Sequence, residues 1–324
     1  MNTNLTRRDF LKTTGLACAA GLVRPAAALA EAAPKKWPVG CRDVHLNAAA
    51  GPDSWTRLKA LGGECTEVAV NLDLSCPNLS HPQHQYTLAS AEGIGLLKGD
   101  LAASGCRISA FLMSNRFDER LEEELACAGK LVKAAQELGV EAIRIDLWPR
   151  RLSKEEFLPF AISTGKRLCA LAAGTPVRFG VENHGEVTND PAFLEQLWAG
   201  VGSDQLGLTL DLGNFYWWGH PLKDLYAIYE RVAPRAIHTH CKSIRYPDDK
   251  KDSPRARGWG YAQYNCPIYE GDIDYKRAVG ILRHAGYRGD LCVENEALGK
   301  FPADQRADVL RQEIALLKRL RDAD

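Results

Sequence analysis

Short apolar runs rich in β-branched residues recur along the chain from residue 37 onward, and segments with a helical spacing of apolar residues separate them. The separating segments carry apolar residues at intervals of three and four positions, as in residues 121–139 and 307–323. The short runs have the length of strands. We therefore predict strands at 39–46, 65–72, 106–113, 141–148, 176–183, 206–213, 235–242 and 290–297.

The order of these segments predicts the fold class. Eight strands that are each followed by a helix are typical of an α/β protein with a parallel eight-stranded barrel, the (β/α)8 or TIM barrel. An open doubly wound sheet is the alternative, but no G-x-G-x-x-G turn follows the first predicted strand, so nucleotide binding has no support. We predict a single TIM-barrel catalytic domain over residues 37–324.

The first 36 residues have a different pattern. Residues 6–12 read TRRDFLK, a weakly apolar run rich in Gly and Ala follows over 13–23, and residues 28–30 read ALA. This resembles a twin-arginine export signal that is cleaved after Ala30; an ordinary helix with two arginines is the alternative. We expect a signal peptide over 1–30, a short leader over 31–36, the twin-arginine export machinery as a partner and a periplasmic location.

Composition and charge exclude some classes of function. The 324 residues are 45% apolar and 25% charged, which are ordinary values for a globular protein. The 41 basic residues balance the 41 acidic ones, which removes the bulk electrostatic argument for nucleic-acid binding. The ten cysteines form no C-x-x-C pair, and several lie inside predicted strands, where we expect buried thiols. Disulfide pairing among the others is left open.

Polar side chains gather at the carboxyl ends of the last four predicted strands. Glu182 ends the fifth, Asp211 lies in the sixth, His238 and His240 lie in the seventh, and Glu294 lies in the eighth. Because TIM-barrel active sites lie at this end, and because unpaired charge is costly inside a barrel, we predict a site there. Carboxylates with one imidazole suit Mn²⁺, Mg²⁺ or Co²⁺ and also admit Zn²⁺.

Such a site is suited to proton transfer beside a carbonyl. A divalent metal ion polarises the carbonyl of a polyol-derived ketone or hydroxyketone and stabilises the ene-diolate. One carboxylate removes the proton from the adjacent carbon, and a second returns it from the opposite face.

Four short segments carry a family resemblance: GVENHG (180–185), LDLGNF (210–215), HTHCKS (238–243) and CVENEA (292–297). They resemble the xylose-isomerase-like barrel superfamily, and more narrowly its exported sugar phosphate isomerase/epimerase members related to tagatose 3-epimerase and inosose dehydratase. The resemblance covers most of the chain after the signal. It implies Glu182 and Glu294 as the catalytic acid/base pair, and a set of metal ligands: Glu182, Asp211, His240 and Glu294.

Six further side chains are predicted to contact substrate: His184, Asn214, His238, Lys242, Glu296 and Trp259. His184 alternatively caps the following helix, and Lys242 alternatively forms a buried ion pair. The chain departs from the family at two places. Asn214 stands where many relatives have a histidine, and Ser243 stands where the family follows its lysine with an aspartate.

Residues 243–272 form a connection far longer than the usual loop between a strand and a helix, and its aromatic residues include Trp259, Tyr261, Tyr264 and Tyr269. Because aromatic rings stack on sugar faces, we interpret this segment as a lid or subsite wall. The alternative is a loop with a purely structural role or a contact between subunits of an oligomer.

We predict that the protein is a metal-dependent sugar or keto-sugar isomerase/epimerase that transfers a proton through an ene-diolate. The alternative is a metal-dependent lyase or dehydratase acting on a keto-sugar, a keto-inositol or a 3-keto-glycoside, because both reactions begin with the same proton abstraction. A non-catalytic sugar-binding protein is disfavoured, since it does not need two carboxylates around a metal. The expected partner is a small-molecule carbohydrate, with no nucleic acid, and a homo-oligomer is compatible with the sequence.

Overall fold

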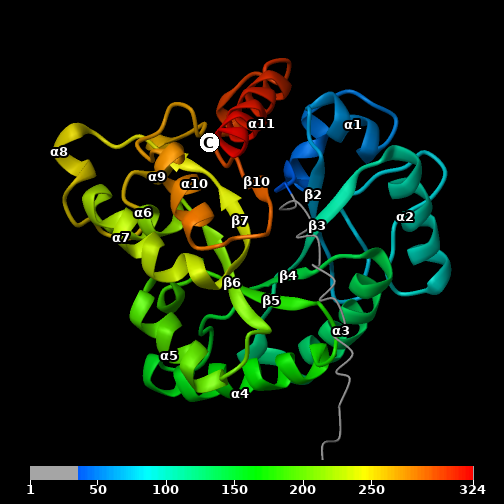
Figure 1. Ribbon diagram of the computed structural model, residues 1–324, viewed down its shortest axis with the longest axis horizontal. Coiled ribbons are helices and arrows are strands. Elements are labelled where there is room, and N and C mark those ends of the chain that lie inside the picture. The colour runs from blue at the N-terminus through cyan, green and yellow to red at the C-terminus, as the bar shows by residue number, and fades with distance from the viewer. Residues whose placement is uncertain (1–35, 324) are drawn as a thin grey trace, which may run out of the picture. The chain divides into compact units, whose positions relative to one another are not determined.

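A closed barrel of eight parallel strands forms the centre of the computed structural model, which describes residues 36–323 (Figure 1). The hydrogen-bonded order around the barrel is β1-β10-β7-β6-β5-β4-β3-β2. The predicted TIM-barrel fold is therefore confirmed. The barrel strands are β1 (Val39–Arg42), β2 (Cys65–Ala69), β3 (Arg107–Met113), β4 (Ala142–Ile145), β5 (Arg178–Glu182), β6 (Leu206–Asp211), β7 (Ala236–Cys241) and β10 (Leu291–Val293).

Helices follow the strands and cover the outside of the barrel; α3, α4 and α5, for example, lie outside β4, β5 and β6 (Figure 1). The helices are α1 (Ser54–Ala60), α2 (Ala91–Ser104), α3 (Phe117–Leu138), α4 (Lys154–Ala172), α5 (Pro191–Val201), α6 (Asn214–Trp218), α7 (Leu222–Val232), α8 (Asp248–Lys251), α9 (Tyr261–Tyr264), α10 (Tyr275–His284) and α11 (Arg306–Asp322).

Local sequence signals account for these helices. In α10 the Asp274 side chain accepts hydrogen bonds from the backbone N–H groups of Lys276 and Arg277, which satisfies two of the free donors at the helix start. Its buried residues recur at three- and four-residue spacing: Tyr275, Ala278, Val279 and Leu282. This stripe faces the core, so the residues that the helical spacing in the sequence predicts to be buried are the ones that are buried in the structure.

The strands that carry the predicted site are almost entirely buried. Every residue of β6 and β7 is buried, because one face of each strand lines the barrel interior and the other packs against helices. A charged side chain on such a strand has no access to bulk water and must be paired within the protein.

The connection over residues 243–272 has a small scaffold of its own. Strands β8 (Ser243–Ile244) and β9 (Asn265–Cys266) pair antiparallel and close the loop that holds α8 and α9. This hairpin was not predicted, because strands of two residues are too short to show any periodicity.

In the described part of the chain, all nine cysteines are free thiols, and every one but the half-buried Cys266 is buried. None of the helices in residues 36–323 is long and apolar enough to cross a membrane. The predicted signal peptide and nearly all of the predicted leader lie outside the described residues.

Candidate functional site at the carboxyl ends of the strands

The structure brings together the side chains that were predicted to hold a metal. One potential ligand atom from each lies within 4.8 Å of the others, and all four side chains are buried. The strand register explains this convergence, because Asp211 on β6 is paired with His240 on β7. The four residues come from the ends of adjacent strands: Glu182 from β5, Asp211 from β6, His240 from β7 and Glu294 directly after β10.

The Nδ1 atom of His240 is the common neighbour of the three carboxylates. It lies 3.1 Å from Glu182 Oε1, 3.4 Å from Glu294 Oε2 and 3.9 Å from Asp211 Oδ2. One Asp211 oxygen is held in place, because Oδ1 accepts hydrogen bonds from the backbone N–H groups of Gly213 and Asn214. The other, Oδ2, is buried and accepts no hydrogen bond. This oxygen faces a cation already, the Lys242 ammonium at 2.9 Å, and has no hydrogen-bond donor that a metal ion would have to displace.

Three permanently charged side chains surround this cluster. Arg42 contacts Glu294, Arg144 contacts Glu182, and the Lys242 ammonium lies 2.9 Å from Asp211 Oδ2 and 3.0 Å from Glu294 Oε2. The Lys242–Asp211 contact is an ion pair without hydrogen-bond geometry.

These neighbours set the protonation of the carboxyl groups. Burial acts to raise the pKa of Glu182, but Arg144 and His240 hold that pKa well below its usual range. Burial likewise opposes ionisation of Glu294, whose pKa is held low by Lys242, His240 and Arg42. For Asp211 burial prevails over the attraction of Lys242 and raises the pKa to about 7. The two glutamates are thus ionised at neutral pH, whereas the aspartate is poised between its two forms.

The donor set fits a divalent metal ion. Three buried carboxylates converge on one imidazole nitrogen, and one of their oxygens, Asp211 Oδ2, accepts no hydrogen bond. Oxygen donors with one imidazole nitrogen match Mg²⁺, Mn²⁺, Co²⁺ or Zn²⁺.

Four of the six residues predicted to contact substrate border this cluster. Asn214 Nδ2 lies 3.3 Å from Glu182 Oε1, and His184 Nδ1 lies 2.9 Å from Asp146 Oδ1, a contact that raises the pKa of His184. Lys242 Nζ donates to Glu296 Oε1 over 2.8 Å. The His184 side chain is 47% exposed and that of Glu296 is 43% exposed, so both face outward from the buried ligands.

The structure does not bring the other two, His238 and Trp259, to the ligand cluster. His238 lies deeper in the barrel and is fully buried, with carboxylates at both ring nitrogens. Trp259 stacks on Tyr264 in the long loop, with ring centroids 5.6 Å apart. The loop residue that does reach the cluster is Tyr261, whose hydroxyl donates to Glu296 Oε2 over 2.7 Å.

Three charged residues of the site were missed by sequence reasoning: Arg42, Glu67 and Arg144. Each lies in a predicted strand, where a charged side chain among apolar neighbours is the same signal that identified the residues of the last four strands. Applied to the first, second and fourth strands, that signal finds all three.

A buried, acidic cluster of potential metal ligands at the carboxyl end of a (β/α)8 barrel defines the class of this protein. The chain belongs to the xylose isomerase-like TIM barrel family, whose model matches residues 56–320. An uncharacterised protein of Methanocaldococcus jannaschii, MJ1311, is 23% identical over 180 residues, a match that spans 52% of this chain and 56% of that protein.

Solved structures share the fold. A xylose isomerase-like TIM barrel protein from Mycobacterium smegmatis in complex with magnesium is 18% identical, with a TM-score of 0.64 over 88% of this chain and 97% of that one. An IolI protein with a bound zinc atom is 14% identical, with a TM-score of 0.64 over 87% and 99%. The 3-keto-D-glucoside 4-epimerase YcjR from E. coli is 15% identical, with a TM-score of 0.61 over 88% and 100%.

Proposed function

We propose that the protein is a divalent-metal-dependent isomerase or epimerase of a sugar or keto-sugar. The observation that carries the proposal is the pair of buried glutamates, Glu182 and Glu294, that approach the same nitrogen of His240 and are both held ionised by neighbouring cations. An ionised carboxylate can remove a proton, and a second carboxylate near the same position can return one after it has taken a proton from water.

Each group has a defined part in the proposed reaction. Glu182, Asp211, His240 and Glu294 would hold a divalent cation, which when bound polarises the substrate carbonyl. Glu182 accepts the proton from the carbon beside that carbonyl, and the C–H electron pair moves into the C=C bond of the ene-diolate. Glu294 takes up a proton from water and delivers it to the other face of the ene-diolate, and Glu182 releases the proton it removed to water, so both glutamates end as carboxylates.

The surrounding side chains provide binding and orientation. Lys242 and the Tyr261–Glu296 pair stand beside Glu294 and can hydrogen-bond substrate hydroxyl groups, while Asn214 orients Glu182. Relatives of the same fold include proteins named as a D-tagatose 3-epimerase-like protein, an L-ribulose 3-epimerase and a 3-keto-D-glucoside 4-epimerase. These names support proton transfer next to a keto group as the reaction class.

A dehydratase or other lyase is the second candidate. Its first step is the same proton abstraction, and the Lys242 ammonium, 3.0 Å from Glu294 Oε2, is a donor that could protonate a departing hydroxyl. One structure of this fold is named a probable 3-DHS dehydratase.

Incubation in deuterated water separates the two candidates. The purified protein is supplied with Mn²⁺, Mg²⁺, Co²⁺ or Zn²⁺ and with a panel of sugars, keto-sugars and 3-keto-glycosides. Deuterium at the carbon beside the carbonyl, with the skeleton intact, supports the isomerase or epimerase. Loss of water or of an aglycone supports the lyase, and inertness towards the whole panel with every metal contradicts both.

Replacement of Glu182 or Glu294 by Gln tests the acid/base assignment. An amide keeps an oxygen atom of similar size but removes the basic carboxylate, so we expect kcat to fall by ~10²–10⁴-fold in each variant. The assay is run at saturating metal, with metal content measured on the same sample. Near-normal kcat at full metal occupancy in both variants contradicts the assignment.

A further inference from the structure

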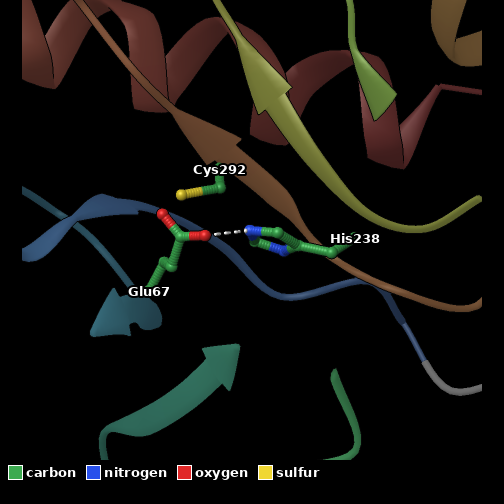
Figure 2. A group of neighbouring side chains, drawn as sticks. All are labelled: Glu67, His238 and Cys292. Atoms are coloured by element: carbon green, nitrogen blue, oxygen red, sulfur yellow. Dashed lines mark hydrogen bonds and ion pairs between the residues drawn. The ribbon is translucent and has the colours of Figure 1, made fainter. Parts of the chain in front are cut away.

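A second row of polar side chains lies beneath the ligand cluster, on the far side of His240. The Nε2 atom of His240 lies 3.1 and 3.0 Å from the two carboxylate oxygens of Glu67, a fully buried residue of β2. Glu67 Oε1 also lies 3.0 Å from His238 Nε2, the contact that Figure 2 draws as a dashed line. His238 Nδ1 in turn lies 2.6 Å from Asp290 Oδ1. These residues form an unbroken hydrogen-bonded chain: Asp290, His238, Glu67 and His240.

Hydrogen-bond chemistry fixes the direction of each contact in this chain. An ionised carboxylate only accepts hydrogen bonds, so each imidazole nitrogen that faces one carries a proton. His238 therefore donates at both nitrogens, to Asp290 and to Glu67. By the same rule His240 donates from Nε2 to Glu67 and from Nδ1 to Glu182. A metal ion at the cluster would replace the Nδ1 proton only, and the Nε2 proton would stay in its hydrogen bond to Glu67.

The strand geometry allows one carboxylate to serve both histidines. His238 and His240 are two positions apart on β7, so their side chains point to the same face, and their ring centroids lie 5.2 Å apart. Glu67 enters from β2, across the barrel interior, and its oxygens lie between the two Nε2 atoms. A ring flip of His240 would place carbon atoms against Glu67 and lose both hydrogen bonds.

We propose that Glu67 is a positioning residue for the metal site: it holds His240 in the tautomer with Nε2 protonated and Nδ1 free to bind the ion, and His238 with Asp290 holds Glu67 in turn. The inference rests on the proposed function, since it assumes that His240 is a metal ligand. Carboxylates that orient a ligating histidine in this way typically contribute 10- to 100-fold to metal affinity.

Cys292 gives the competing explanation for the same residues. Its sulfur stands beside Glu67 and His238 (Figure 2), and potential ligand atoms of the three lie within 4.8 Å of one another, so they could hold a second ion. The contacts of Glu67 argue against this, because its oxygens already face His238, His240 and, at 3.1 Å, the Nε atom of Arg42.

Zinc binding to Glu67→Gln tests the proposal. We expect the Zn²⁺ affinity of the purified protein, measured by competition with a chromophoric chelator, to fall ~10- to 100-fold. Cys292→Ser should bind one Zn²⁺ per chain with unchanged affinity. Glu124→Gln is the matched control: Glu124 is as buried and accepts hydrogen bonds from Asn115, Arg116 and Arg120, but none of its hydrogen bonds reaches His240.

A second readout reports the tautomer itself. In the ¹⁵N-histidine NMR spectrum of the zinc-loaded protein, His240 should show a metal-bound Nδ1 and a slowly exchanging Nε2 proton. In Glu67→Gln that proton should exchange faster than in Glu124→Gln, the variant that controls for a general loss of stability.

Each outcome discriminates between the explanations. Wild-type zinc affinity together with an unchanged Nε2 proton in Glu67→Gln overturns the proposal, as does loss of a second bound ion in Cys292→Ser. If the wild-type protein binds no zinc, the proposed metal-dependent function itself is contradicted. If it binds zinc but Glu67→Gln binds it equally well, only the role of Glu67 is contradicted. Should Glu67→Gln not fold, His238→Gln tests the same row of hydrogen bonds from its other end. We expect its Zn²⁺ affinity to fall about 10-fold. Wild-type Zn²⁺ affinity in His238→Gln would contradict the proposal.

Discussion

Arg144 pairs with two buried carboxylates of the site, Glu182 and Asp146. Its guanidinium contacts Glu182, lies 2.9 Å from Asp146 Oδ2 and donates to the carbonyl oxygen of Met113 over 3.1 Å. The side chain is only 5% exposed, so solvent does not screen these interactions. It keeps two buried carboxylates ionised at once.

We therefore predict that Arg144→Met lowers the free energy of unfolding by about 3–5 kcal/mol, because removing one partner of a buried ion pair leaves uncompensated charge. Urea unfolding measures the change. Arg167→Met is the control, since its paired contacts with Glu122 are solvent-exposed and water screens such pairs, so little stability should be lost. Equal losses in the two variants contradict the prediction.

The four residues that the sequence predicts as metal ligands do come together in the structure, but the contacts that hold them could not be predicted. Glu182 and Asp211 stand out because they end apolar strands in consecutive units of the barrel. Glu67 lies on β2 and meets His240 only across the closed barrel, and no local pattern encodes that contact. For His238 the two-residue period gave the correct face of the strand, but depth along the barrel axis depends on strand stagger, which the sequence does not display.

At the scale of elements, Arg255 is one of the residues that join the loop over residues 243–272 to α6 and the residues after it. Arg255 donates to the carbonyl oxygens of Tyr216 and His220, and its guanidinium carbon lies 4.5 Å and 4.3 Å from the ring centroids of Tyr216 and Tyr246. Arg255 also donates to the carbonyl oxygens of Lys250 and Ser253 in its own loop, so one guanidinium links the loop to the end of α6.

We predict that Arg255→Ala loosens this loop without unfolding the barrel. Limited trypsin digestion should cut the variant within residues 245–257 at least several-fold faster than wild type, because local opening exposes the backbone. Arg257→Ala removes a neighbouring arginine with a single 5.5 Å contact to Trp218 and should digest as wild type does. Identical digestion of both variants contradicts the role of Arg255.

The strand and helix segments were predictable, but their limits were not. The predicted strand 290–297 is paired only over Leu291–Val293, because the chain leaves the ladder where Glu294 turns towards its partners. The long loop was recognised by its length, whereas its β8–β9 closure depends on contacts between residues about twenty positions apart.

At the scale of the molecule, Glu313 joins the last helix to the catalytic end of the barrel. Its carboxylate accepts hydrogen bonds from the backbone N–H of Ile268 over 2.9 Å and from Asn295 Nδ2 over 2.8 Å. The side chain is fully buried, and burial raises the pKa of Glu313 to about 7. The folded protein therefore holds a proton here that the unfolded chain releases near pH 4.5.

We predict that the stability of wild type relative to Glu313→Gln decreases as pH rises from 4.5 to about 7. The raised pKa means that the folded state binds more protons over this window, so its stability falls with pH, whereas glutamine does not titrate. The change should be on the order of 3 kcal/mol. Urea unfolding of both proteins at pH 4.5, 6 and 7.5 measures it, and a gap that is constant or that widens in favour of wild type contradicts it.

We further propose export by the twin-arginine route, on the pattern of residues 6–30. Replacement of Arg7 and Arg8 together by Lys should leave the precursor inside the cell, whereas changing Lys12 to Arg should not. Cell fractionation measures the distribution, and unchanged periplasmic delivery of the double variant argues against this route.

The pairing of β1 with β10 has a consequence for synthesis. Strand β10 closes the barrel by pairing with β1 on one side and β7 on the other, and Glu294 follows it immediately. A nascent chain that has not yet released residues 291–294 from the ribosome therefore presents two unpaired strand edges and an incomplete ligand set. Such edges favour aggregation and contact with chaperones. The barrel and its cluster of charged groups are thus completed together, after translation has passed the last strand.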